Sequence, residues 1–137
     1  MMMFRSITAA ILLSICTNAQ AWTFDRVKIL DNYDGDTFTA QFEIWPSHFV
    51  ISNVRVLGVD TPEIRGQCEQ EKALAVKAKA FTAKQLTNRV SVVINKMGKY
   101  GRALGVVYID NQRLDTMLIE AGFGRENHGE KRTSWCN

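Results

Sequence analysis

Two short acidic motifs carry the side chains of this chain that are best suited to chemistry. The first is Asp34-Gly35-Asp36-Thr37, and the second runs from Arg55 to Glu63 and contains Val59-Asp60-Thr61-Pro62. Each motif places carboxylates at the end of an apolar, β-branched run, where they can hold a hard cation. The second motif adds an arginine and a glutamate, the groups that a phosphate-cleaving site needs. Together the motifs predict a metal-dependent phosphodiesterase site.

Asp36 and Asp60 are the candidate metal ligands. Two carboxylates alone in a small pocket would repel each other, and the pKa of one would rise. A calcium ion relieves this repulsion, with water and a backbone carbonyl completing its oxygen shell. Taken alone, Asp34-Gly35-Asp36 is better explained as an ordinary hairpin turn. It does not fit an EF-hand loop, because the first ligand position would fall on Leu30.

Glu63 is the candidate general base, since a carboxylate beside a cation could take a proton from a water that attacks phosphorus. A glutamate directly after Pro62 is also a common arrangement at the start of a helix. The spacing of Glu63 from Asp60 is what favours the catalytic interpretation.

Arg55 and Arg102 are the candidate phosphate clamps, because a guanidinium stays charged and its fork matches phosphate oxygens. Arg55 lies within a very apolar strand, where an unpaired charge would be costly. Arg102 ends the polar segment Lys99-Tyr100-Gly101-Arg102. Lys99 and Tyr100 could bind a neighbouring phosphate or could simply be solvated.

The elements that must position these residues follow from the apolar pattern. Alternating and β-branched runs predict strands at 23–31, 37–44, 49–59, 90–95 and 103–109, and helical spacing predicts helices at 69–88 and 114–121. The expected buried faces are Phe38, Ala40, Phe42 and Ile44 in the second strand, and Leu74, Ala78, Phe81 and Leu86 in the first helix. The tail, residues 123–137, is polar and expected to be mostly irregular. This order predicts an α+β fold, a small five-stranded Greek-key barrel with packed helices.

Residues 1–21 are expected to be a signal peptide. Arg5 supplies the positive start, 7–16 is a short apolar run, and Ala19-Gln20-Ala21 matches a cleavage site, so cleavage is expected after Ala21. The run is too short for a permanent membrane anchor. A lipoprotein signal at Cys16 is weaker, because bulky Ile15 precedes it. The expected mature domain is 22–137, in the periplasm or secreted.

Cys68 and Cys136 are the cysteines of this mature domain, and a pair in an oxidising compartment indicates a disulfide. The bridge is expected to tie down the C-terminal end. A zinc site is disfavoured, because His48 and His128 show no ligand-like spacing to either cysteine. The net charge falls from +3 to +2 when Arg5 leaves with the leader. Such mild basicity is weak support for nucleic-acid binding.

Taken together, the motifs resemble the staphylococcal nuclease family, from about Val27 to Gly124. The resemblance implies an oligonucleotide-binding (OB-fold) barrel with helices. It also implies cleavage of single-stranded DNA and RNA, and more slowly of duplex DNA, with one calcium ion.

The resemblance also implies a role for each residue in the three motifs. Asp36, Asp60 and the carbonyl of Thr61 are expected to bind calcium, and Glu63 to act as the base. Arg55 and Arg102 are expected to clamp the scissile phosphate, with Lys99 and Tyr100 on a terminal phosphate.

The chain departs from the best-known member of the family in its C-terminal part. It is shorter there and lacks the final long helix, and His128 stands where that member has a phosphate-binding tyrosine. The Cys68–Cys136 pair is also absent from that member. Our hypothesis is that the disulfide anchors the shortened tail.

The sequence therefore predicts an exported, monomeric, calcium-dependent nuclease with little sequence specificity and no stable membrane anchor. One alternative is a non-catalytic OB-fold module that binds nucleic acid by stacking and charge. Another is an extracellular protein–protein module in which a metal only stabilises the fold. The survival of both aspartates, Glu63 and both arginines favours the enzyme.

Overall fold

The computed structural model describes residues 20–137, so the predicted signal peptide lies almost wholly outside the described residues and stays a prediction. The elements are β1 (Trp22–Phe24), β2 (Lys28–Asn32), β3 (Thr37–Trp45), β4 (His48–Val56), β5 (Gly58–Asp60), α1 (Glu69–Gln85), β6 (Val90–Met97), a 3₁₀ turn η1 (Lys99–Gly101), β7 (Ala103–Ile109), β8 (Gln112–Arg113), α2 (Leu114–Glu120) and β9 (Arg125–Asn127). Within 20–137, no helix is long and apolar enough to cross a membrane.

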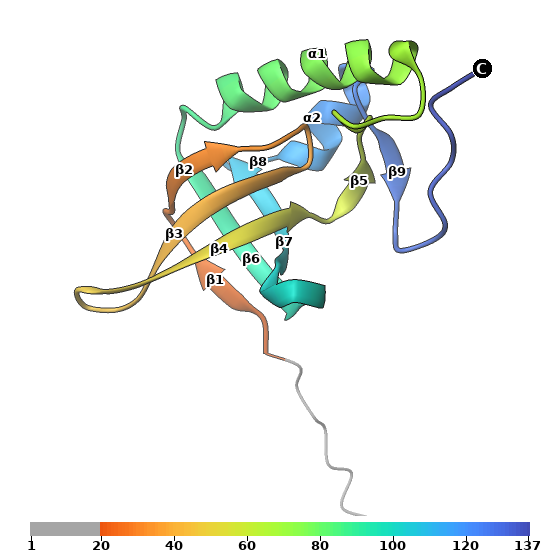
Figure 1. Cartoon of the computed structure of the whole chain (residues 1–137). Coiled ribbons are helices and arrows are strands. Elements are labelled where there is room, and N and C mark those ends of the chain that lie inside the picture. Colours follow the sequence, from red (N-terminus) through yellow and green to blue (C-terminus); the bar gives the residue numbers. More distant parts are fainter. Residues whose placement is uncertain (1–19) are drawn as a thin grey trace, which may run out of the picture.

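Most of the strands in the described residues form one curled sheet in the order β1-β6-β7-β4-β3-β2, with β8 added to β7 (Figure 1). The strands β5 and β9 form a separate two-stranded sheet. Every pairing along this order is antiparallel except β4 with β7. The two ends of the order, β1 and β2, come from one run of chain, so a single bent strand contacts both edges of the sheet. This arrangement confirms the predicted OB-fold barrel with helices.

The first predicted strand, 23–31, is wrong as a continuous element, because it is split between β1 and β2. At the bend, the carbonyl of Asp25 accepts hydrogen bonds from the side chains of Ser91 and Arg89. Val27 then donates to the carbonyl of Val90. The bend lets this run of chain pair with β6 through β1 and with β3 through β2.

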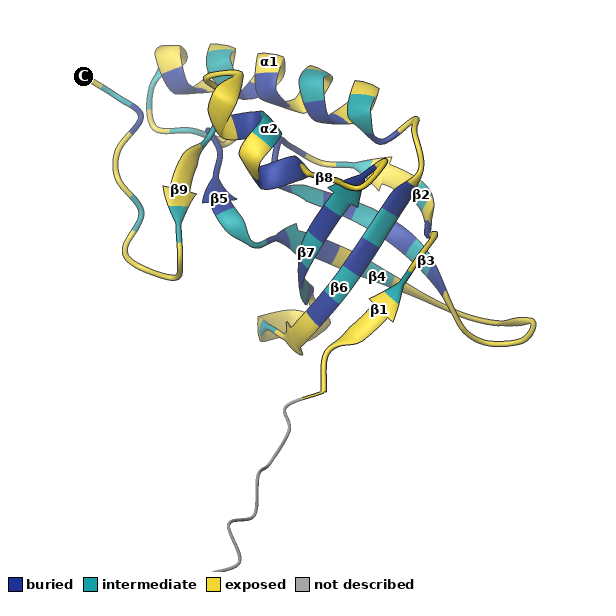
Figure 2. Ribbon diagram, turned by 180° about the vertical axis from the view of Figure 1, so that it is seen from behind, coloured by how far each residue is buried: buried dark blue, intermediate teal, exposed yellow. Residues whose placement is uncertain are grey.

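The barrel interior holds the main apolar core, which includes the predicted Phe38, Ala40 and Phe42. Ile44 is 57% exposed, so its predicted burial is wrong. The reason is geometric: the β3–β4 hairpin projects beyond the rest of the sheet, and its tip has nothing to pack against (Figures 1 and 2).

Helix α1 packs on the barrel through a stripe of small and polar residues. Its buried positions are Glu71, Ala75, Ala78 and Thr82. The predicted face was therefore wrong in part, because Leu74 and Phe81 are only half-buried. The hydroxyl of Thr82 donates to the carbonyl of Gly35 at 2.7 Å, which holds the β2–β3 turn against the helix. Small residues allow this close approach.

Two predicted element bounds were also wrong. The 49–59 strand breaks at Leu57. The tail is mostly irregular, as predicted, but it contains the short strand β9, which pairs with β5. Gly58 permits the break, because its φ is +90° and a Cβ there would lie 2.4 Å from Asp115 Oδ2. Helix α1 ends at Gln85 rather than at residue 88, because the next side chains turn back to its last carbonyls.

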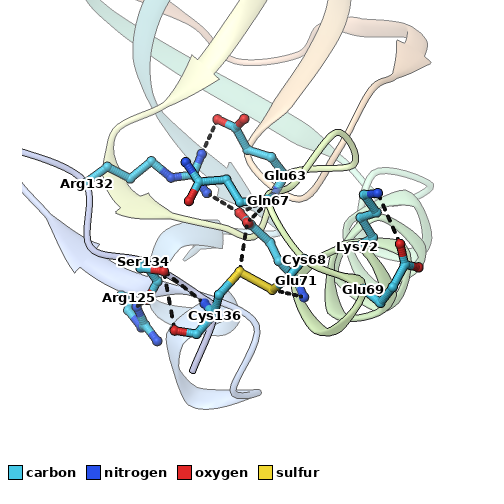
Figure 3. The surroundings of a disulfide bond; sticks show 10 residues. All are labelled: Glu63, Gln67, Cys68, Glu69, Glu71, Lys72, Arg125, Arg132, Ser134 and Cys136. Carbon is cyan, nitrogen blue, oxygen red and sulfur yellow. Dashed lines mark hydrogen bonds and ion pairs between the residues drawn. A yellow bond between two sulfur atoms is a disulfide. The ribbon is translucent and has the colours of Figure 1, made fainter.

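The Cys68–Cys136 disulfide joins the start of α1 to the end of the tail, which confirms the predicted pairing (Figure 3). Cys68 also caps α1, where its sulfur accepts from the amide of Glu71. The double substitution C68S/C136S is expected to lower the free energy of unfolding by about 4 kcal/mol, because the bridge closes a long loop. Serine retains the capping ability. Urea unfolding of the variant at the wild-type midpoint would contradict this expectation.

Candidate active site

Two turns bring the acidic motifs into direct contact. Asp36 follows the β2–β3 turn, and its carboxylate accepts a hydrogen bond from the amide of Thr61 at 3.0 Å. The carbonyl of Asp36 accepts from the amide of Val56 at 2.9 Å. A side chain at Gly35 would collide with that of Thr61, because a Cβ there would lie 2.9 Å from it. The glycine of the first motif therefore permits the second motif to approach.

Arg55 lies between the two candidate metal ligands. Its Nη1 is 3.0 Å from Asp36 Oδ2, and its Nη2 is 3.6 Å from Asp60 Oδ1. Nη1 also donates to the carbonyls of Val56 and Val59, at 2.8 and 2.9 Å. The side chain is 21% exposed. The guanidinium thus faces the carboxylates rather than bulk solvent.

One cavity of about 200 Å³ gathers the candidate side chains that the sequence singled out. Its lining residues are Tyr33, Asp34, Asp36, Thr37, Arg55, Asp60, Glu63 and Arg102. Thr61 adjoins this cavity through its hydrogen bond to Asp36. The structure therefore places Asp36, Asp60, Arg55, Glu63 and Arg102 in one site.

A second hollow, of about 470 Å³, begins where the first ends. Its lining residues include Lys99, Tyr100 and Arg102, and it shares Tyr33, Thr37 and Arg102 with the first cavity. Lys99 and Tyr100 thus lie beside the site and not within it. Arg102, which lies between η1 and β7, lines both hollows.

The first cavity has more carboxylates than guanidinium groups. Asp34, Asp36, Asp60 and Glu63 face Arg55 and Arg102. Burial, and then the negative charge of Asp36, raise the pKa of Asp34 to about 7. Burial also raises the pKa of Asp60, although hydrogen bonding from Trp135 opposes the shift. Burial in this cavity therefore disfavours ionisation of Asp34 and Asp60.

The tail contributes side chains that sequence reasoning missed. Trp135 Nε1 donates to Asp60 Oδ2 at 3.2 Å, and Arg132 Nη2 donates to the carbonyl of Thr61 at 3.1 Å. Arg132 also pairs with Glu63 and with buried Glu71 of α1 (Figure 3). The adjacency of these tail residues to Cys136, expected to be bridged to Cys68, was a signal that could have found them.

His128 lies outside the first cavity. It is exposed, and its Nε2 is 2.7 Å from a carboxylate oxygen of Glu126. The hydrogen bond to Glu126 raises the pKa of His128. His128 lines a separate hollow, to which Arg55 also contributes. In this arrangement the imidazole of His128 pairs with Glu126 and not with a residue of the first cavity.

Comparison with known proteins gives consistent matches. A family model described as staphylococcal nuclease homologue matches residues 53–134. A thermonuclease of Staphylococcus hyicus is 30% identical over 112 residues, which cover 80% of this chain and 62% of that protein. An uncharacterised protein of Methanocaldococcus jannaschii is 28% identical over 125 residues, which cover 72% of this chain and 57% of that protein. The chain thus spans less than two thirds of the length of these relatives.

Proposed function

The chain belongs to the staphylococcal nuclease family, and from this premise we propose that its domain, residues 22–137, is an exported, monomeric, calcium-dependent nuclease. Family membership supports a nuclease-like hydrolase that acts on nucleic acid. The proposal adds that it hydrolyses phosphodiester bonds of DNA and RNA with little sequence specificity. The observation that carries it is the cavity shared by Asp36, Asp60, Arg55, Glu63 and Arg102.

The donor set of the cavity fits a hard divalent cation. Asp36 and Asp60 offer only oxygen, and the carboxylates of the lining outnumber its guanidinium groups. The nearby carbonyl of Thr61 offers another oxygen, which accepts a hydrogen bond from Arg132. Oxygen ligands of this kind suit calcium. Bound there, calcium would offset the carboxylate charge and polarise a phosphate oxygen.

The roles of the other residues follow from their positions. Glu63 lines the cavity, and its exposed carboxylate, which also pairs with Arg132, could take a proton from the attacking water. Arg55 comes from β4, and Arg102 follows η1, so the two guanidinium groups approach a bound phosphate from different elements. Together they can stabilise the charge that develops on the phosphate oxygens.

The second hollow gives the proposed substrate strand a continuation. Arg102 belongs to both hollows, and Lys99 and Tyr100 line the second. Arg102 and Lys99 could bind successive phosphates of the strand through charge, without contacting the bases. Such binding supports cleavage with little sequence dependence.

The proposed export rests on the leader-like residues 1–21 and on the disulfide, which persists in an oxidising compartment.

The test is incubation of purified 22–137 with end-labelled single-stranded DNA and RNA, in calcium and in a calcium chelator. We expect both substrates to be cleaved in calcium. The cleavage should be lost in the chelator and should return when calcium is added back. D36N should bind calcium more weakly and require more of it. Binding of the strands without cleavage would instead indicate the non-catalytic OB-fold module, and calcium binding without any nucleic-acid interaction would indicate the protein–protein module.

A further inference from the structure

The guanidinium of Arg132 contacts Asp60, the last residue of β5, and Thr61 and Glu63 in the loop that follows. Its Nη1 forms an ion pair with the carboxylate of Glu63. Its Nη2 donates to the carbonyl of Thr61 at 3.1 Å, and its Nε lies 3.4 Å from Asp60 Oδ2. The candidate base and two candidate ligands therefore share a single contact residue, which comes from the tail.

The guanidinium of Arg132 is itself held from behind by α1 (Figure 3). Its Nη2 donates to Glu71 Oε1 at 2.9 Å, and Glu71 is buried. The carboxylate of Glu71 also accepts from the backbone amides of Glu63, at 3.2 Å, and Gln67, at 2.9 Å. Burial alone would raise the pKa of Glu71, but these amides and Arg132 lower it. Arg132 is thus part of a fixed network that includes the base.

The tail on either side of Arg132 is anchored. Before it, β9 pairs with β5, and after it Cys136 is bonded to Cys68. Trp135 is buried, and the guanidinium of Arg125 lies 3.8 Å from the centre of its ring. These contacts limit how far the backbone of Arg132 can move.

The two oxygens of Asp60 have different partners. Oδ2 accepts from Trp135 at 3.2 Å and lies beside Arg132, whereas Oδ1 lies 3.6 Å from Arg55. The tail thus holds one oxygen and leaves the other on the side of Arg55 and Asp36. Groups that hold a ligand in this way tune metal affinity and activity strongly.

We propose that Arg132 is a positioning residue that orients Asp60 and Glu63 for the reaction, and that the disulfide acts on the site by holding Arg132 in place. This rests on the proposed function of the same site. The argument is geometric: a guanidinium fork can contact several acceptors at once, whereas a lysine ammonium is a point charge. A positive charge alone at position 132 should therefore be insufficient to orient Asp60 and Glu63.

The test compares R132K and R132Q with K131Q, a matched control on the adjacent exposed residue. In R132K, which keeps the charge, calcium affinity measured by calorimetry and kcat are each expected to fall about 10-fold or more. KM should change less than kcat, R132Q should also be slower, and K131Q should match the wild type.

Two results would overturn the proposal. A faster R132Q would mean that Arg132 blocks Glu63 instead of orienting it. A lower melting temperature for R132K with unchanged kcat and calcium affinity would mean that the residue serves only stability.

The role of the disulfide is tested by a double-mutant cycle. C68S/C136S should reproduce the kcat of R132Q, and combining the two changes should add little, because both act through the same contacts. If the loss of kcat in the combined variant equalled the product of the two separate losses, the disulfide would act on the site by another route.

Hydrogen exchange of the Glu63 amide, without calcium or substrate, separates this inference from the proposed function. The amide donates to Glu71, which Arg132 also contacts, so it should exchange faster in R132K than in the wild type or K131Q. An inactive wild type with this exchange pattern would refute the nuclease alone. An active wild type with identical exchange and kinetics in R132K would refute the positioning role alone.

Discussion

Replacing Glu63 by glutamine is expected to lower kcat by about 10²- to 10⁴-fold. Glutamine keeps the size of the side chain but cannot accept the proton of the attacking water. The carboxylate lines the cavity that holds Asp36 and Asp60, and it is exposed enough to contact a water. Single-turnover cleavage of labelled single-stranded DNA at saturating calcium measures the effect.

The control for this substitution is E69Q, which removes a carboxylate from the solvent-exposed face of α1. It should leave kcat unchanged. Glu63→Gln should retain calcium binding, because the ligands assigned to calcium are Asp36, Asp60 and the Thr61 carbonyl. If E63Q bound calcium and turned over at the wild-type rate, another group would have to be the base.

Replacing Arg102 by alanine is expected to lower kcat/KM by about 10²- to 10³-fold, through loss of one electrostatic partner of the reacting phosphate. Arg102 lines both hollows and is exposed, so removing it leaves the barrel core intact. Its backbone amide and carbonyl make the hydrogen bonds of the η1 turn, and these are retained in alanine. Thermal stability should therefore stay close to that of the wild type.

Arg26→Ala is the matched control for Arg102→Ala, because Arg26 is an exposed arginine that lines neither hollow. It should change cleavage little at constant ionic strength. An R102A rate equal to that of R26A would remove Arg102 from the catalytic assignment. Arg55 is a poorer choice for this comparison, because its loss would also remove the ion pair of Asp36 and one of the two ion pairs of Asp60, and would destabilise the fold.

The local parts of the site were predictable from short motifs. Asp34-Gly35 forms the predicted β2–β3 hairpin turn, and Thr37 pairs with Arg55 because β3 and β4 form the next hairpin. Hairpins connect residues that are close in the chain, so turn residues and alternation indicate their register. The positions of Asp36 and Arg55 follow from that register.

Errors in the predicted elements occur where long-range contacts override the local pattern. Ile44 continues the alternation of Phe42 yet is exposed, because burial depends on whether another element covers the hairpin tip. The buried face of α1 is centred on small residues such as Ala75 and Ala78, since the helix packs close to the turn that carries Gly35. Spacing shows which residues share a face, but the partner decides which face is buried.

The side-chain types of the candidate site, and most of the strands and turns that present them, follow from the local sequence. These depend on side-chain type, alternation and turn residues, which act over a few positions. Long-range packing, in contrast, pairs β9 with β5 and places Arg132, Trp135 and Glu71 next to the candidate site. The contacts of Arg132 with Thr61 and of Trp135 with Asp60 join residues 71 and 75 positions apart. No local periodicity encodes such contacts, because they arise only when the barrel, the helix and the disulfide have brought the tail back to the loop.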